Sequence, residues 1–196
     1  MYEIEMALPL LVRQTQPVAE ERAAEVSANA LLVEAVRRGD QEAFGKLYDL
    51  YAPMVHGILL ARVPWSEVDD LVQDVFLVAF RKLDALREDA AFGGWLAMIA
   101  RNRAMDFHRR AQKTEQLPED VALESQPEAE MDAARALAAI RQLPEAYRET
   151  LILRLVEGMT GPEIAERTGL TPASVRVNLH RGMKMLRERL GMEETK

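Results

Sequence analysis

The chain has 196 residues, 48% of them hydrophobic but only 6% aromatic, and a formal net charge of −7. Ala, Leu, Glu and Arg are abundant and apolar residues recur at helical spacing, so we expect an all-α protein, and the length favours two small domains. The absence of cysteine excludes disulfides and thiolate zinc sites, and the three scattered histidines lack metal-ligand spacing, so no metal or other cofactor is expected.

Residues 1–26 show no sustained helical period, and we expect them to form a tail. Glu3 and Glu5 precede the short apolar run Ala7–Val12, whereas a signal peptide begins with basic residues. No stretch approaches the roughly 18 apolar residues that a membrane span requires. We therefore expect a soluble, cytoplasmic protein without membrane insertion.

The segment 27–113 is predicted to be a helical bundle, because its apolar residues recur at helical spacing. A break at Gly39-Asp40 separates a short helix from a longer one. Ser66–Leu83 is the clearest amphipathic segment, since its apolar residues follow one another three and four positions apart throughout. We predict that Ser66 caps this helix and that its apolar stripe faces a core.

The stretch Arg87–Gly94 holds two adjacent glycines and is predicted to be a loop. A further helix is expected from Trp95 to about Ala111, and its apolar neighbours place Trp95 in the core rather than on a nucleic-acid surface. Residues 95–113 contain five cations and a single carboxylate, Asp106, which gives a local charge of about +4. They are Arg101, Arg103, Arg109, Arg110 and Lys113.

The segment 114–130 contains two prolines, six carboxylates and no basic residue, so we expect a flexible, self-repelling linker. Beyond it the pattern predicts four helices, separated by Pro144, by Gly158 and by Gly169-Leu170. Their expected ranges are Met131–Leu143, Glu145–Val156, Pro162–Thr168 and Pro172–Leu190.

The last two of these helices have the spacing of a helix-turn-helix. Thr160 and Glu163 form a capping box, Gly169 suits a turn of positive φ, and Thr171 is placed to cap the second helix. Val175 is expected to pack that helix inward. Its outward residues offer hydrogen-bonding and basic groups suited to base edges and phosphates in a major groove. They are Thr171, Ser174, Arg176, Val177, Asn178, Arg181 and Lys184.

Four stretches resemble bacterial RNA polymerase sigma factors of the extracytoplasmic-function (ECF) group. DDLVQDVFLVAFRKLDAL and FGGWLAMIARNRAMDFHRR are similar to region 2 of that group, and LPEAYRETLILRLVEGMTGPEIAERTGL and SVRVNLHRGMKMLRERL to region 4. The resemblance implies two small helical domains, a region 2 bundle and a region 4 helix-turn-helix, joined by the acidic linker. Its implied divisions are a tail 1–26, region 2 at 27–113, the linker 114–130, region 4 at 131–191 and a tail 192–196.

The resemblance also implies partners: core RNA polymerase, through the clamp helices of its largest subunit and its flap region, promoter DNA, and an anti-sigma factor. Polymerase binding is implied for the polar face of Ser66–Leu83, with Asp70, Gln73, Asp74, Arg81 and Lys82. The −35 element would be read by the outward residues of the second helix of the helix-turn-helix.

For the −10 element the resemblance implies capture of an unstacked base beside the two glycines. Phe92 is expected to offer a stacking surface, Asn102 to read a base edge, and the neighbouring cations to hold phosphates. Binding energy would open the duplex, so no catalytic residue and no enzymatic activity are expected. The −10 set is Phe92, Arg101, Asn102, Arg103, Arg109, Arg110 and Lys113.

The second helix departs from the group's usual pattern, which resembles VKSRLHRARKKL and here reads VRVNLHRGMKML. Asn178 and Met183 replace two basic positions, which puts the usual −35 sequence preference in doubt because Asn favours adenine and Arg favours guanine. Two other hypotheses stay open. One is a stand-alone helix-turn-helix regulator with a helical N-terminal regulatory domain, and the other is an interaction protein such as an adaptor or antagonist.

Overall fold

The computed structural model describes residues 28–114 and 128–191. Throughout these ranges the chain forms helices and turns, without a strand, which confirms the all-α prediction. The two expected tails and most of the expected linker lie outside the described residues. Among the described helices, none is long and apolar enough to cross a membrane.

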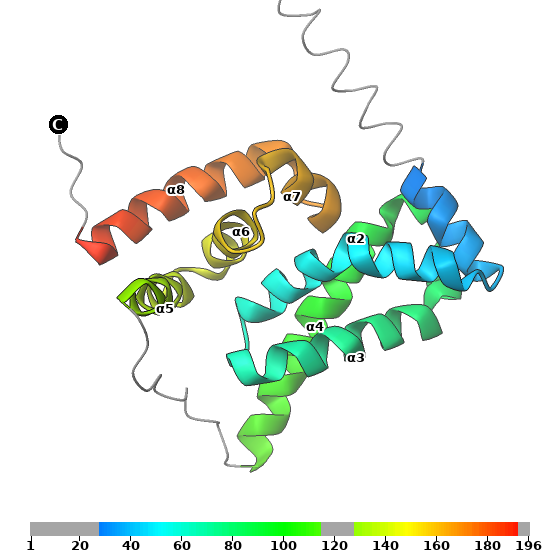
Figure 1. The fold of residues 1–196 in the computed structure, drawn as a ribbon, viewed down its shortest axis with the longest axis horizontal. Coiled ribbons are helices and arrows are strands. Elements are labelled where there is room, and N and C mark those ends of the chain that lie inside the picture. The colour runs from blue at the N-terminus through cyan, green and yellow to red at the C-terminus, as the bar shows by residue number, and fades with distance from the viewer. Residues whose placement is uncertain (1–27, 115–127, 192–196) are drawn as a thin grey trace, which may run out of the picture.

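The N-terminal block, residues 28–114, is a bundle of helices (Figure 1). After a helix at 28–37 come α2 (Gln41–Leu60), α3 (Val68–Arg81) and α4 (Phe92–Thr114), with 3₁₀ turns η1 (Trp65–Glu67), η2 (Leu83–Ala85) and η3 (Asp89–Ala91) between them. Asp40 begins α2 by accepting hydrogen bonds from the backbone N–H groups of Glu42 and Ala43, so the expected break at Gly39-Asp40 is confirmed.

The apolar stripe of α3 faces the core as predicted, with Val68, Val72, Val75, Phe76 and Ala79 buried. The prediction that Ser66 caps this helix is wrong. The chain already turns in η1, so α3 starts only at Val68, and its N-cap residue, Glu67, makes no side-chain capping bond. Carboxylates in the first turn, Asp69 and Asp70, complement the exposed N–H groups instead.

The prediction of a loop across Arg87–Gly94 is also wrong at its end, because α4 begins at Phe92. Gly93 and Gly94 therefore lie in the first turn of a helix. Gly93 is a glycine for a packing reason: a Cβ at this position would lie 2.7 Å from the carbonyl oxygen of Arg167, in another helix. Close approach of two backbones, and not a turn, requires the small residue here.

The C-terminal block, residues 128–191, contains α5 (Glu128–Arg141), α6 (Glu145–Leu155), α7 (Gly161–Thr168) and α8 (Pro172–Leu190). All four predicted helices are present, although α5 begins inside the segment expected to be linker. The Thr160–Glu163 capping box, the positive φ of 74° at Gly169 and the Thr171 cap are all confirmed. These local signals set the start of α7, the turn after it and the start of α8.

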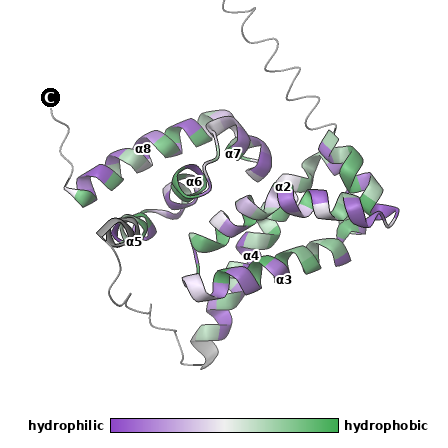
Figure 2. Ribbon diagram, viewed as in Figure 1, coloured by the Kyte–Doolittle hydropathy of each residue, from purple (hydrophilic) through white to green (hydrophobic). Residues whose placement is uncertain are grey.

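The two blocks pack against each other, α2 against α6 and α7, and α4 against α7. A single hydrophobic cluster contains buried residues of both, among them Leu59, Phe92, Leu153 and Ile164. The helices in Figure 2 carry hydrophobic and hydrophilic residues on different parts of their surface, as helices that share a core do. The sequence led us to expect two modules connected only by a linker, so this shared core is a property of the tertiary structure.

Gly182 shows how closely the helices of the C-terminal block approach. A Cβ at this position would lie 3.1 Å from Leu151 and 3.2 Å from Tyr147 on α6. We expect Gly182→Leu to lower the free energy of unfolding by about 1–3 kcal/mol through overpacking. Urea denaturation followed by circular dichroism measures the change.

The matched control is Gly45→Leu, also in a helix. Nothing lies within 4 Å of the corresponding Cβ at Gly45, and leucine favours a helix over glycine, so stability is expected to stay equal or rise by up to about 1 kcal/mol. Equal destabilisation by both substitutions would contradict the overpacking explanation.

Candidate nucleic-acid interface

The helix-turn-helix presents an exposed polar face on α8. Val175, Gly182 and Leu186 are buried, while the predicted outward residues are exposed, apart from Asn178, which is half-buried. No ion pair within the described part of the chain involves Arg176, Arg181 or Lys184. These three cations of α8 are thus available to an anionic partner.

An open, mainly apolar groove borders this face where α7 and α8 begin. It encloses about 550 Å³, and Arg176 is its charged residue. Its lining consists of Gly161, Pro162, Pro172, Ala173, Val175, Arg176 and Leu179. The groove therefore places apolar groups beside Arg176, at the edge of the basic face.

Within the −10 set, Asn102, Arg109 and Arg110 are exposed on α4, and Arg103 is half-buried. Arg109 makes an ion pair of 2.8 Å with Asp106, one turn before it. The side chain of Lys113 lies outside the described residues. The basic face of α4 is therefore partly neutralised by the helix that carries it.

Phe92 occupies a different place from the one expected. Its ring is only 1% exposed and contacts Tyr51 edge to face at 5.1 Å between ring centroids. A stacking surface for a base must be open to solvent, so Phe92 acts as a core residue in this structure. Trp95 is half-buried and packed against the core, as the sequence led us to expect.

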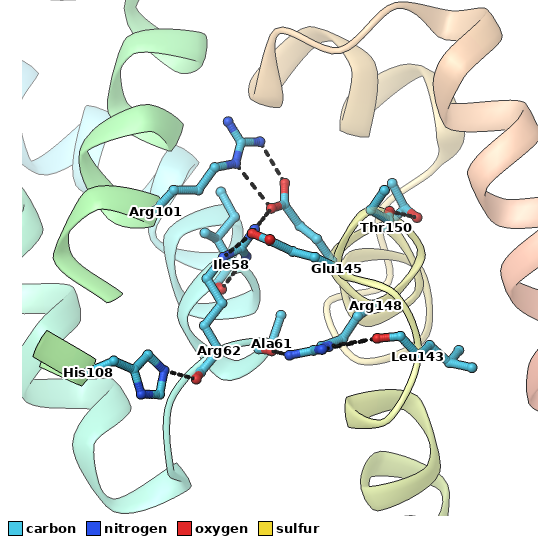
Figure 3. A network of polar contacts seen from close by, with 11 residues as sticks. Ile58, Ala61, Arg62, Arg101, His108, Leu143, Glu145, Arg148 and Thr150 are labelled. Carbon is cyan, nitrogen blue, oxygen red and sulfur yellow. Dashed lines mark hydrogen bonds and ion pairs between the residues drawn. The ribbon is translucent and has the colours of Figure 1, made fainter. Parts of the chain in front are cut away.

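Arg101 is the residue of the −10 set that the structure places most differently from the expectation. Its Nε donates to Glu149 Oε2 at 3.1 Å and its Nη2 to Oε1 at 2.6 Å. Arg62, which follows α2, donates to the same Oε2 at 2.6 Å. Figure 3 shows both arginines of the N-terminal block reaching across to α6. We name these three residues the Glu149 bridge.

In the Glu149 bridge, the positive charges of Arg62 and Arg101 balance the carboxylate of Glu149, a residue that is only 4% exposed. Burial alone would raise the pKa of Glu149, but the hydrogen bonds and positive charges of Arg101 and Arg62 outweigh it, so the pKa lies below its ordinary value. The carboxylate is thus held in its charged form between the blocks. Sequence reasoning missed Glu149, because one glutamate in a helix carries no signal of its distant partners.

Other arginines of the C-terminal block satisfy backbone carbonyls of the N-terminal block. Arg148 donates to the oxygen of Ala61 at 3.0 Å and Arg141 to that of Val63 at 3.2 Å, just beyond the end of α2. Carbonyls at a helix end lack partners in their own helix, so these bonds give the end of α2 a fixed place against α5 and α6.

The polar face of α3 is exposed as expected, with Asp70, Gln73, Asp74, Arg81 and Lys82 all in contact with solvent. Among them lies Leu77, which is 52% exposed. The sequence held a signal for Leu77, since this leucine falls outside the apolar stripe of the helix. Its exposure gives the face an apolar centre surrounded by charges.

His56 and Glu157 form a further pair between the blocks, with 2.7 Å from Nδ1 to Oε1. The hydrogen bond to Glu157 raises the pKa of His56 above its ordinary value. A raised pKa in the folded state gives stability that is complete below the unfolded-state pKa and is lost as the pH rises through the folded-state pKa. We therefore expect the free energy of unfolding to fall as the pH rises above about 6.5, the ordinary pKa of histidine.

The expected loss is roughly 1.4 kcal/mol for each unit by which the pKa is raised. His56→Gln should remove this dependence, while His180→Gln, at an exposed position of α8, should retain it. Urea denaturation at several pH values measures it. A profile that His56→Gln leaves unchanged would show that the pair does not stabilise the fold.

Comparison with known proteins finds a sigma factor family that matches each half of the chain. The Sigma-70 region 2 family matches residues 47–114, and the Sigma-70 region 4 family matches residues 133–186. The ECF RNA polymerase sigma-E factor of Haemophilus influenzae is 30% identical over 85% of this chain and 97% of its own length. The RNA polymerase sigma factor CarQ of Myxococcus xanthus is 34% identical over 81% of this chain and 95% of its own.

A solved structure is also similar to this chain. The structure of CnrH in complex with the cytosolic domain of CnrY matches with a TM-score of 0.60 and 27% identity, covering 85% of this chain and 99% of the matched one. Two sigma regions in the same order, on the observed helices and over nearly the whole length of the relatives, show that this chain belongs to the ECF sigma factors of RNA polymerase.

Proposed function

We propose that this sigma factor directs RNA polymerase to its promoters by holding the −10 element with α4 and the −35 element with α8. The observation that carries the proposal is the face of α8, whose cations are exposed on a helix-turn-helix capped at both helices. The polymerase performs the chemistry of transcription, so the sigma factor acts by binding and supplies no catalytic group.

At the −35 element, α8 enters the major groove with its first turns. Asn178 makes the paired donor and acceptor contact that suits adenine, and Val177, 41% exposed, offers an apolar surface to a thymine methyl group. Arg176, Arg181 and Lys184 hold phosphates or guanine edges. The hydroxyls of Thr171 and Ser174 share a hydrogen bond, and Thr171 also accepts one from the backbone N–H of Ser174. Both side chains are therefore placed to contact the DNA backbone at the edge of the major groove.

At the −10 element, α4 contributes Asn102 to a base edge, and Arg101, Arg103, Arg109, Arg110 and Lys113 to phosphates. Capture of an unstacked base repays an unstacking cost of a few kcal/mol, so strand opening needs no hydrolysis. Phe92 supports this surface from the core, where the structure has it, and does not stack on the base.

The exposed face of α3 docks on the clamp helices of the polymerase's largest subunit, and the C-terminal block docks on the flap region. Leu77 supports the first contact, since an exposed leucine surrounded by Asp70, Gln73, Asp74, Arg81 and Lys82 has the composition of an interface centre with a polar rim. The protein works in the cytoplasm, where the polymerase is.

An anti-sigma factor is the third proposed partner. The similar protein CnrH was solved in complex with the cytosolic domain of CnrY. By analogy, a protein of this kind binds the present chain and withholds it from the polymerase.

Run-off transcription with core polymerase and genomic fragments tests the proposed function. The chain should support promoter-specific transcripts, and a variant with Arg176→Ala, Asn178→Ala and Arg181→Ala should lose them while still binding polymerase. Each lost base contact is expected to weaken promoter binding by about 1–3 kcal/mol. Arg38→Ala, at an exposed arginine remote from α8, is the control. Unchanged transcription by the triple variant would exclude α8 as the recognition helix.

Leu77→Asp tests the polymerase contact. If Leu77 is the centre of the interface, the charge should weaken binding to core polymerase about tenfold or more, measured by fluorescence anisotropy of the labelled chain. Leu31→Asp introduces the same change at a leucine that is 63% exposed on helix 28–37 and should have little effect. Equal losses in the two variants would argue against a docking role for α3.

A further inference from the structure

Two methionines are exposed on the outer face of α4. Met98 is 54% exposed and Met105 is 61% exposed, although methionine usually lies inside a soluble protein. The residues that pack α4 into the core lie on the opposite side of the helix, and they are Leu96, Ala97, Ala100 and Ala104. A single exposed apolar side chain would need no explanation. Two at related positions of one helix indicate a shared contact.

Met98 and Met105 lie on the same line of the helix surface as Asn102 and Arg109. The four residues follow one another at intervals of four, three and four positions, so their side chains lie one above another along α4. Asn102 and Arg109 are exposed as well. Within the described residues, the side-chain amide of Asn102 forms no hydrogen bond. We name these four residues the methionine row: an open amide between two thioethers, followed by a guanidinium.

The spacing of the methionine row suits a flat ring. Met105 follows Met98 by two turns of helix, which is about 10 Å along the axis. A planar ring with an apolar group against each face needs about 7–8 Å between those groups, and the flexible methionine side chains can close the remaining distance. The thioether sulfur is polarizable and contacts aromatic rings favourably. A ring held between the two methionines would turn its edge toward the amide of Asn102.

The charges of α4 favour a nucleic-acid base over other flat ligands. The helix contains five cations and one carboxylate, Asp106. A base in a single strand has a phosphate on either side of it, and these cations attract phosphates. Stacking covers both faces of a base in a duplex, so only an unstacked base fits between two side chains. Phe92 is buried and cannot stack on such a base, whereas the methionine row is open to it.

We propose that the methionine row is the base-holding site of α4. Met98 and Met105 contact the two faces of one unstacked base of the −10 element, Asn102 bonds to the edge of that base, and Arg109 holds a neighbouring phosphate. This inference rests on the proposed role of α4 at the −10 element. The thioethers accept the face of any base, while the amide, which both donates and accepts hydrogen bonds, distinguishes one base from another.

Two double variants of the full-length protein separate apolar contact from mere side-chain length. The leucine variant, Met98→Leu with Met105→Leu, keeps apolar groups in the row. The glutamine variant, Met98→Gln with Met105→Gln, has side chains of similar length that are polar. Leu31→Gln makes the same kind of change at a leucine that is 63% exposed, outside α4, and is the control. All of these positions are exposed, so circular dichroism should show the same helix content in each protein.

The first readout compares two fluorescein-labelled single strands by anisotropy. One is an oligonucleotide of mixed sequence, and the other has the same length but is built of abasic sites, so it keeps the phosphates and lacks the bases. We expect the parent, the leucine variant and Leu31→Gln to bind the normal strand about tenfold more tightly than the abasic strand. The glutamine variant should bind both strands alike. A parent chain that binds the two strands alike, or equal losses in the leucine and glutamine variants, would overturn the base-holding site.

Salt dependence is the second readout, because it separates contacts to bases from contacts to phosphates. The glutamine variant should keep the slope of log affinity against log salt concentration, whereas Arg109→Ala should reduce that slope by about 0.7 and weaken binding to both strands. An effect of Arg109→Ala with an unchanged glutamine variant would overturn the methionine row and leave α4 as a helix that binds DNA. No effect in any of the α4 variants would overturn both the row and the proposed function of α4.

Discussion

One buried carboxylate connects the two halves of this protein. Glu149 lies between Arg62 and Arg101, and its lowered pKa follows from the two guanidiniums that surround it. An ionised group so deeply buried is stable only while its partners are present. Beside the shared hydrophobic core, the position of α6 against α2 and α4 therefore depends on charges that lie far apart in the sequence and meet only when the blocks are packed.

The helix-turn-helix is built on the opposite principle, since its geometry comes from neighbours in the chain. The capping box at Thr160, the left-handed Gly169 and the Thr171 cap each satisfy backbone groups within a few residues. Gly182 then allows α8 to lie close to α6. A recognition unit formed by local interactions keeps its shape while its surroundings change, which is what a module that meets both its own chain and DNA requires.

Arg101 lies where the proposed −10 surface and the contact between the blocks overlap. It is one of the cations proposed to hold promoter phosphate, and in this structure it donates to an acidic side chain of the same protein. A carboxylate and a phosphate present similar oxygens to arginine, so the same guanidinium suits either partner. The glycines of α4 and the His56–Glu157 pair add contacts of shape and of titratable charge to the same boundary.

The sequence by itself determined the helices, their caps, the apolar stripe of α3 and the exposed face of α8, because helical periodicity and capping are interactions between residues close in the chain. Its motifs also identified the sigma family. Only the tertiary structure decided that the backbone of α7 packs against Gly93 and Gly94 and that Phe92 lies in the core. It also decided that Leu77 is exposed and that Arg101 contacts Glu149. These outcomes depend on contacts between residues distant in sequence, and a single chain read in order carries no periodic signal for such contacts.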